Sequence, residues 1–316
     1  MGRVLNDRSE EEMIDRLING IKEKGNPSVA GLDPTLEMVP DDLREEFFAE
    51  YGMTARAVGK LFYEFNRNII DQICDIVPAV KPQIAMYEKF GTEGLKAYND
   101  TCAYAKQKGL IVIGDIKRGD ISSTAAAYAA HIGGAQIGEN KLETWQEDAV
   151  TLNPYMGSDG IRPFIEVCKE GGKGIFLLVK TSNPSSSEMQ DLVLADGRTV
   201  YEAAGDLVEL WGEEAMGAQG YSNVGAVVGA THREEGAKLR KRMPHTFFLV
   251  PGYGAQGGTA EDIAEFFDEN GIGAIVNSSR GITAAYKKSD EFSDSEYAKA
   301  AREAAIRMRD DLRRVL

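Results

Sequence analysis

The sequence predicts an α/β barrel in which eight parallel strands alternate with helices. Eight short apolar runs, each bounded by turn residues, recur along almost the whole chain of 316 residues. Most of these runs are continuously apolar, as expected of strands that are buried on both faces. Helix-patterned segments separate them, and this alternation matches a (β/α)8 barrel. A doubly wound open sheet is the competing architecture, because it also alternates strands with helices.

The expected strands occupy residues 28–33, 78–84, 110–116, 149–153, 174–180, 224–231, 246–251 and 273–278. The expected helices occupy 54–75, 92–108, 122–130, 160–170, 199–216, 233–242 and 259–269, with a last one from about 293 to the end. A further helix at 9–24, in an N-terminal extension of residues 1–27, is expected to cover the barrel bottom or to pack outside it. Residues 183–223 exceed the length of one crossover helix, which predicts an insertion over the barrel mouth after strand five. With no dividing linker, residues 1–316 are expected to form one domain.

Composition limits the classes of function. Acidic residues outnumber basic ones, 50 to 36, and the formal net charge of −14 argues against general binding to nucleic acid or anionic membranes. No segment offers about 18 uninterrupted apolar residues, so no membrane span is expected. The three cysteines, Cys74, Cys102 and Cys168, are widely spaced, which favours reduced thiols in a cytoplasmic protein.

A charged cluster follows the third apolar run. Side chains two residues apart in a strand share a face, so Asp115 and Lys117 are expected to point the same way, with Asp120 in the loop beyond. Charges at the end of a buried strand are costly unless they are paired. The cluster is therefore either a site that binds an anionic substrate and moves a proton, or an ion pair that closes the strand while Asp120 caps the next helix.

Polar groups end nearly every predicted strand, where a barrel of this type places its active site. This consistency favours an enzyme. The groups are Asp33, Lys81, the Asp115 cluster, Asn153, residues 180–182, Thr231, residues 251–258 and residues 277–281.

The last two strand ends have the composition of a phosphate site. Glycines in 252–258 allow the backbone to approach a ligand, and Arg280 follows Ser279 at the start of a helix. The alternative is that these glycines only form a tight turn. They also fit Gly-x-Gly-x-x-Gly, but late in the chain, so no dinucleotide is implied. No histidine or cysteine pair has metal-ligand spacing, and Lys117 places a cation where a metal at Asp115 and Asp120 would lie, so no metal is expected.

Five motifs together resemble orotidine 5′-phosphate decarboxylases, in particular the longer subgroup of that family. They are Gly-Leu-Asp-Pro at 31–34, Lys-Pro-Gln at 81–83, Asp-Ile-Lys-Arg-Gly-Asp-Ile at 115–121, Pro-Gly-Tyr-Gly-Ala-Gln-Gly-Gly at 251–258 and Ser-Arg-Gly at 279–281. The resemblance implies a homodimeric barrel that converts orotidine 5′-phosphate to uridine 5′-phosphate and CO₂, the last step of UMP synthesis, without a metal or organic cofactor.

The resemblance also implies roles for individual residues. Lys81, Asp115, Lys117 and Asp120 would form a charged catalytic array, in which Lys117 is the proton donor. Asp120 and Thr124 would reach the site of the partner subunit. The other implied contacts are Asp33 to the ribose, Ser182 to the pyrimidine, and Gln256, Ser279 and Arg280 to the phosphate. Ser122 departs from the Pro or Gly of many relatives, which changes the turn but not the charges.

Two other functions remain open. A sugar-phosphate lyase or aldolase would use Lys117 or Lys180 as a Schiff base, although acids beside Lys117 keep it protonated and poorly suited to that role. A barrel that binds a nucleotide as a sensor is the other, although the desolvation of the charged array is hard to justify for binding alone.

Overall fold

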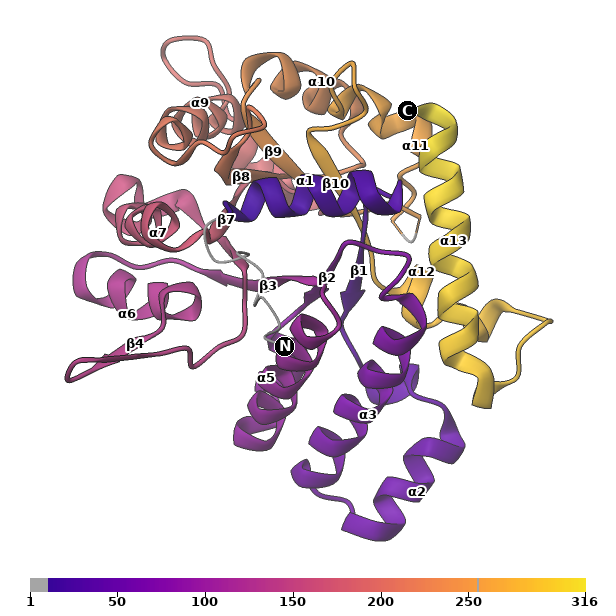
Figure 1. The fold of residues 1–316 in the computed structure, drawn as a ribbon. Coiled ribbons are helices and arrows are strands. Elements are labelled where there is room, and N and C mark those ends of the chain that lie inside the picture. The colour runs from indigo at the N-terminus through magenta and orange to yellow at the C-terminus, as the bar shows by residue number, and fades with distance from the viewer. Residues whose placement is uncertain (1–10, 255) are drawn as a thin grey trace, which may run out of the picture.

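The computed structural model describes residues 11–254 and 256–316, and in them eight parallel strands close into a barrel (Figure 1). Their order around the barrel is β1, β10, β9, β8, β7, β6, β3, β2. The strands are β1 Ser28–Leu32, β2 Ala79–Pro82, β3 Ile111–Arg118, β6 Ala149–Leu152, β7 Gly174–Lys180, β8 Ser222–Val228, β9 Thr246–Val250 and β10 Ala274–Ser278. The first strand pairs with both the second and the last, so the barrel prediction is confirmed and the open sheet is wrong.

Helices surround the barrel. They are α2 Asp41–Tyr51, α3 Ala55–Ile73, α4 Ala85–Glu88, α5 Gly91–Gln107, α6 Ser122–Gly133, α7 Ser158–Gly171, α8 Ser187–Gln190, α9 Val200–Gly212, α10 Arg233–Arg242, α11 Ala260–Ile263, α12 Arg280–Thr283 and α13 Tyr297–Val315. A long apolar stripe on α3, including Leu61, Phe65 and Ile69, is fully buried against the strands. Most helices predicted from the apolar pattern have a counterpart within a few residues of their expected position. The helix predicted over 259–269 is shorter, because only Ala260–Ile263 is α-helical and a 3₁₀ turn follows at Ala264–Phe266.

The N-terminal helix α1, Met13–Lys24, closes the bottom of the barrel (Figure 1). Its buried residues, among them Met13, Leu17 and Ile21, pack against the apolar side chains that fill the barrel interior. The backbone N–H of Ile14 donates to Asn223 Oδ1 at 3.0 Å, which ties the helix to the start of β8. Residues 9 and 10 of the predicted helix, like the rest of residues 1–10, lie outside the described residues.

Helix α2 and a hairpin of β4 Ala135–Ile137 with β5 Asn140–Leu142 were not predicted. Every side chain of α2 is exposed or half-exposed, and so is every side chain of the hairpin. Only Leu43, Phe47 and Phe48 of α2 pack against the core, and none of them is fully buried. A helix or hairpin with so little buried surface leaves a weak apolar period in the sequence, which is the signal on which these predictions depend.

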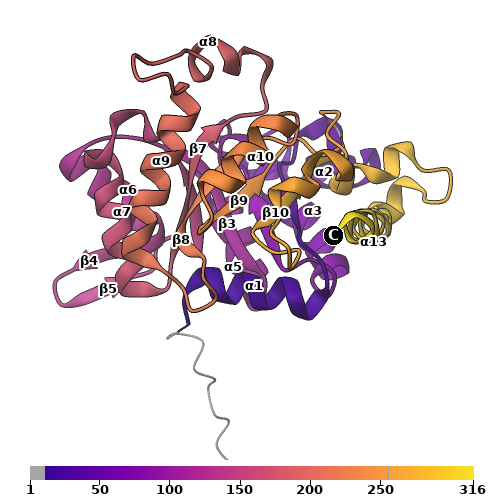
Figure 2. The ribbon, with the colours of Figure 1, turned by 90° about the horizontal axis from the view of Figure 1, so that it is seen from above.

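The predicted insertion contains the ordinary connection between β7 and β8, because α9 lies within it. The additional part is residues 183–199, which hold a 3₁₀ turn at Pro184–Ser186 and the short helix α8. This segment lies on the side of the barrel opposite α1 (Figure 2). Because this segment follows the carboxyl end of β7 and the barrel strands are all parallel, the carboxyl ends of all eight strands lie on the same side as residues 183–199.

Candidate active site

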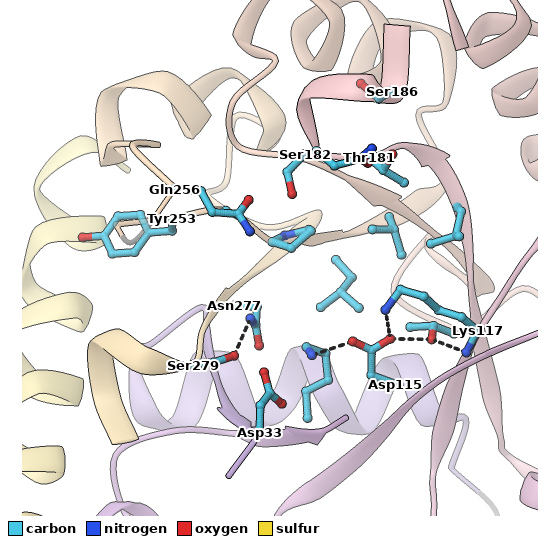
Figure 3. A pocket seen from close by; sticks show the side chains of 18 of the residues that line it. Asp33, Asp115, Lys117, Thr181, Ser182, Ser186, Tyr253, Gln256, Asn277 and Ser279 are labelled. Carbon is cyan, nitrogen blue, oxygen red and sulfur yellow. Dashed lines mark hydrogen bonds and ion pairs between the residues drawn. The ribbon is translucent and has the colours of Figure 1, made fainter. Parts of the chain in front are cut away.

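A cavity of about 740 Å³ opens at the carboxyl ends of the strands (Figure 3). Its floor carries the charged ends of β1, β2 and β3, and one wall is formed by the loops after β9 and β10. The segment after β7 forms the opposite wall. The predicted site residues that line it are Asp33, Lys81, Asp115, Lys117, Ser182, Gln256, Ser279 and Arg280.

Asp115 lies at the centre of the charged floor and contacts two lysines. The Lys81 ammonium donates to its Oδ2 at 2.8 Å, and the Lys117 ammonium donates to its Oδ1 at 2.5 Å. The Thr151 hydroxyl donates to the same Oδ1 at 2.8 Å. Asp115 and Lys81 are buried, whereas the Lys117 side chain is 46% exposed and reaches toward the cavity. The expectation that Asp115 and Lys117 share a face is confirmed.

The array keeps its charges in spite of burial. Burial alone would raise the pKa of Asp115, but the attraction of Lys81 and Lys117 holds that pKa well below its usual range. Burial alone would lower the pKa of Lys81, but Asp115, followed by Asp33, raises it above its usual value. The carboxylate and the Lys81 ammonium therefore both remain charged at neutral pH.

The backbone at Lys117 adopts a conformation that side-chain-bearing residues rarely take. Its φ is +46°, in the left-handed region, and its N–H donates to Thr151 Oγ1 at 3.1 Å. The register between β3 and β6 also shifts between Gly114 and Arg118. Such conformations cost about 1–3 kcal/mol and persist where neighbours enforce them, typically at functional sites. Here Thr151 holds both the Lys117 backbone and the Asp115 carboxylate.

The opposite side of the cavity presents hydrogen-bonding groups from β1, β10 and two loops (Figure 3). Gln256 follows β9, and Ser279 and Arg280 follow β10, so the three groups predicted to bind phosphate line one cavity. Asn277 Nδ2 donates to Ser279 Oγ at 3.3 Å. Two buried oxygens, Asp33 Oδ1 and Asn277 Oδ1, have no hydrogen-bond partner within the part of the chain that the structure describes. Buried acceptors of this kind normally find a donor, so a ligand with hydroxyl or N–H groups fits between them.

Polar contacts hold the segment after β7 against the end of that strand. Gln190 accepts from the Thr181 backbone N–H at 2.9 Å and donates to Thr181 Oγ1 at 2.7 Å. The Lys180 ammonium, fully buried, donates to Asp191 at 2.5 Å. Thr181 is followed by Ser182, whose side chain points into the cavity (Figure 3). The Schiff-base alternative at Lys180 is therefore disfavoured, since that ammonium is paired and does not line the cavity.

Two predicted residues lie outside the cavity of their own chain. Asp120 is half-exposed and Thr124, on α6, is exposed, and neither lines the cavity. Asp120 Oδ1 accepts from the backbone N–H of the adjacent Ile121 at 2.7 Å and does not cap the first turn of α6. The helix-capping interpretation of Asp120 is wrong.

Sequence reasoning gave no role to Thr151, Gln190 or Asn277, although all three line the cavity. Asn277 ends a predicted strand and so carried the same signal as Asp33. Thr151 lies inside an apolar run, and Gln190 lies in a segment without periodicity, so neither carried a signal.

A family model described as orotidine 5′-phosphate decarboxylase / HUMPS family matches residues 12–294. A curated relative from Clostridium tetani, named orotidine 5′-phosphate decarboxylase, is 45% identical over 301 residues, covering 95% of this chain and 97% of the relative. The chain belongs to this family. A relative of the same name from Caldicellulosiruptor saccharolyticus is 43% identical over 286 residues, covering 90% of this chain and 93% of the relative.

Comparison with solved structures supports the same family. The Leishmania donovani OMP decarboxylase superposes with a TM-score of 0.70 at 30% identity, covering 95% of this chain and 99% of that chain. Among the described residues, none of the helices combines the length and the apolar character required to cross a bilayer.

Gly31 in β1 leads to a first prediction, because its backbone lies against Ser279. A Cβ at this position would lie 1.9 Å from Ser279 Oγ and 2.7 Å from Ser279 Cβ. We expect Gly31→Ala to displace Ser279 and to weaken binding of a nucleotide monophosphate such as UMP about tenfold. Isothermal titration calorimetry measures the effect. Gly171→Ala, where the Cβ meets Lys173 at an ordinary 3.7 Å, is the matched control; equal affinities in the two variants would contradict the prediction.

Proposed function

We propose that this protein decarboxylates orotidine 5′-phosphate to uridine 5′-phosphate and CO₂ as a step of pyrimidine biosynthesis. One observation carries the proposal: the Lys81–Asp115–Lys117 array shares a cavity with the Gln256 and Arg280 loops. A charged proton-transfer group and a separate anion site are the two parts this reaction requires. Three unpaired thiols among the described residues, Cys102 and Cys168 being buried, fit the cytoplasmic location that we also propose.

Lys117 is the group that we assign to the reacting carbon. Loss of CO₂ from C6 leaves an electron pair in the plane of the pyrimidine ring, which no neighbouring carbonyl can delocalise. An ammonium at C6 stabilises that developing charge and then donates a proton to the carbon. Lys117 suits this role because its half-exposed side chain extends into the cavity. Its ammonium is held by an ion pair with the buried Asp115.

Asp115 has two effects in this scheme. Its carboxylate accepts a hydrogen bond from the Lys117 ammonium at 2.5 Å and so holds the proton donor in place. It also lies where the substrate carboxylate would be placed, so that it repels the bound carboxylate more than the less charged transition state. Thr151 and Lys81 hold the Asp115 carboxylate in place against this repulsion.

The remaining contacts position the nucleotide. Asp33 Oδ1, buried and unpartnered within the described chain, would accept a hydrogen bond from a ribose hydroxyl. Ser182 faces the cavity between the array and Gln256 (Figure 3), where it would contact the pyrimidine. Gln256, Ser279 and Arg280 would bind the phosphate, for which the guanidinium is well suited. Residues 183–199 would then act as the cover of the bound nucleotide.

The array would be completed by a second copy of the chain. Asp120 and Thr124 sit at the rim beside a group of exposed apolar side chains, namely Ile121 at 46%, Tyr155 at 81% and Met156 at 52% exposure. Large exposed apolar side chains beside a site favour an interface. We propose a homodimer in which Asp120 and Thr124 of the partner subunit enter the cavity.

Turnover in EDTA tests the reaction and its independence of metal together. We expect the purified protein to remove the ultraviolet absorbance of orotidine 5′-phosphate at full rate in EDTA, and Lys117→Ala to abolish this activity while retaining the fold by circular dichroism. Recovery of lost activity by Mg²⁺ or Zn²⁺ would contradict the metal-free mechanism.

Two outcomes would favour the alternative functions. A folded protein that binds the substrate without turnover would favour a nucleotide sensor. A covalent adduct trapped by borohydride in the presence of a ketose phosphate would favour a sugar-phosphate lyase or aldolase.

Arg280→Ala tests the phosphate site. We expect kcat/KM to fall at least about a hundredfold, because a charge-assisted bidentate contact is lost, while the melting temperature stays close to the parent value. Arg233→Ala, on the exposed surface and paired only with Glu265 within the described residues, is the control. A near-normal kcat/KM for Arg280→Ala would refute the phosphate assignment.

Subunit complementation tests the shared site. Lys117→Ala and Asp120→Asn are each expected to be nearly inactive. In a mixed dimer, one of the two sites combines the intact Lys117 of one protomer with the intact Asp120 of the other. Co-expression of the two variants should therefore restore roughly one quarter of the parent activity per chain. No recovery in a sample shown to contain mixed dimers would rule out the proposed contribution across the interface.

A further inference from the structure

Tyr253 begins the loop that carries Gln256 and lines the cavity, but its hydroxyl points away from the other lining side chains. Figure 3 shows the phenol pointing away from the other labelled side chains. The hydroxyl donates to Asp311 Oδ2 on α13 at 2.5 Å, a distance typical of a hydrogen bond to a charged acceptor. The loop after β9 is thereby connected to a helix more than fifty residues later in the sequence.

The same helix also holds the far end of this loop. Arg314, one turn after Asp311 on α13, donates to Asp311 at 3.0 Å and to Glu261 at 2.5 Å. Glu261 lies in the first turn of α11, which begins directly after the loop. Contacts from α13 therefore fix the backbone before and after Gln256.

Inside these two anchors the loop is folded back on itself. The Gly254 N–H donates to the Gly258 carbonyl at 2.8 Å, and the Gly258 N–H donates to the Gly252 carbonyl at 3.2 Å. A displacement of Tyr253 would therefore move the turn that carries Gln256. The loop after β10 continues directly into α12, and none of the hydrogen bonds of the Tyr253 anchor involves its residues.

The anchor persists across the physiological pH range. Burial, followed by the hydrogen bond to Asp311, raises the pKa of Tyr253 above its usual value, so its hydroxyl stays a donor. The hydrogen bond from Tyr253 in turn lowers the pKa of Asp311, which stays an acceptor. Only substitution, and not titration near neutral pH, is expected to release the contact.

We propose that Asp311 is a positioning residue for phosphate recognition, which acts through Tyr253 on the loop that carries Gln256. The C-terminal helix thereby sets how tightly the cavity holds the phosphate of its substrate. This inference rests on the proposed function, since it concerns the phosphate of that same substrate.

The test compares the affinities for UMP and for uridine, which differ only by the phosphate. We expect Tyr253→Phe and Asp311→Ala each to weaken UMP binding about tenfold and to change uridine binding less than about twofold. Asp311→Asn keeps an acceptor for the tyrosine hydroxyl and should retain most of the UMP affinity. Asp310→Ala removes the neighbouring carboxylate, which pairs with Arg309 at the surface, and is the matched control.

The double variant identifies the route. If Asp311 acts through Tyr253, Tyr253→Phe with Asp311→Ala should bind UMP no more weakly than either single variant. If Tyr253→Phe weakens UMP binding but Asp311→Ala does not, the proposal is overturned in favour of a direct contact of the hydroxyl with phosphate. Parallel losses for UMP and uridine would overturn it in favour of general destabilisation. A parent protein that fails to prefer UMP over uridine would contradict the proposed function instead.

Discussion

A buried carboxylate between two ammonium groups is the interaction on which the rest of the site depends. Removing the buried Lys81 would leave Asp115 without its buried partner, and a buried unpaired charge is strongly destabilising. Lys117 is half-exposed in the cavity, so water can take its place beside Asp115. A hydrogen bond from Thr151 stabilises this carboxylate further. Placing the Lys117 ammonium beside it requires an additional, strained backbone conformation at Lys117. The three charges of Lys81, Asp115 and Lys117 sum to +1. In the proposed dimer, Asp120 of the partner subunit would bring the array to neutrality before the anionic substrate enters.

The barrel places this site, whose buried charges cost stability, at the opposite end from the interactions that stabilise the fold. At one end, α1 and the apolar interior form a continuous core, so that end can be packed for stability alone. At the other end, parallel strands deliver their last residues to one rim, although those residues lie far apart in the sequence. Strands β1, β2 and β3 supply the charged floor, and β9 and β10 lead into the proposed anion site. Neither set has to be contiguous in the chain.

How much of the fold and the site could be predicted depends on whether the residues involved produce a periodic pattern of apolar and polar positions in the sequence. The strands could be located because burial on both faces requires continuous apolar runs, and the ends of those runs identified Asp33 and Lys81. The period of two succeeded at Asp115 and Lys117, but it does not describe the end of β7, where it would place Leu178 and Lys180 on one face. There Leu178 lines the cavity, while the register shifts between Leu178 and Lys180 and the lysine turns away from it. A bulge of this kind has no signature in the residue types, so only the backbone reveals it.

The two sides of the cavity that we propose for the phosphate and for the pyrimidine are held by different kinds of contact. On the phosphate side, Gln256 belongs to a turn tied internally and to α13, so that little freedom is lost when an anion binds. On the pyrimidine side, Gln190 and Asp191 hold the cover through a few polar contacts, while Met189 and Val193 remain exposed at 54% and 70%. Such a segment opens at lower free energy than a packed helix. Because the phosphate lies far from the reacting carbon, its binding energy helps the reaction only if it closes the cover and fixes the ring. The proposed anion site, which is tied to α13, beside a segment that is held by few contacts is the arrangement that would let it do so.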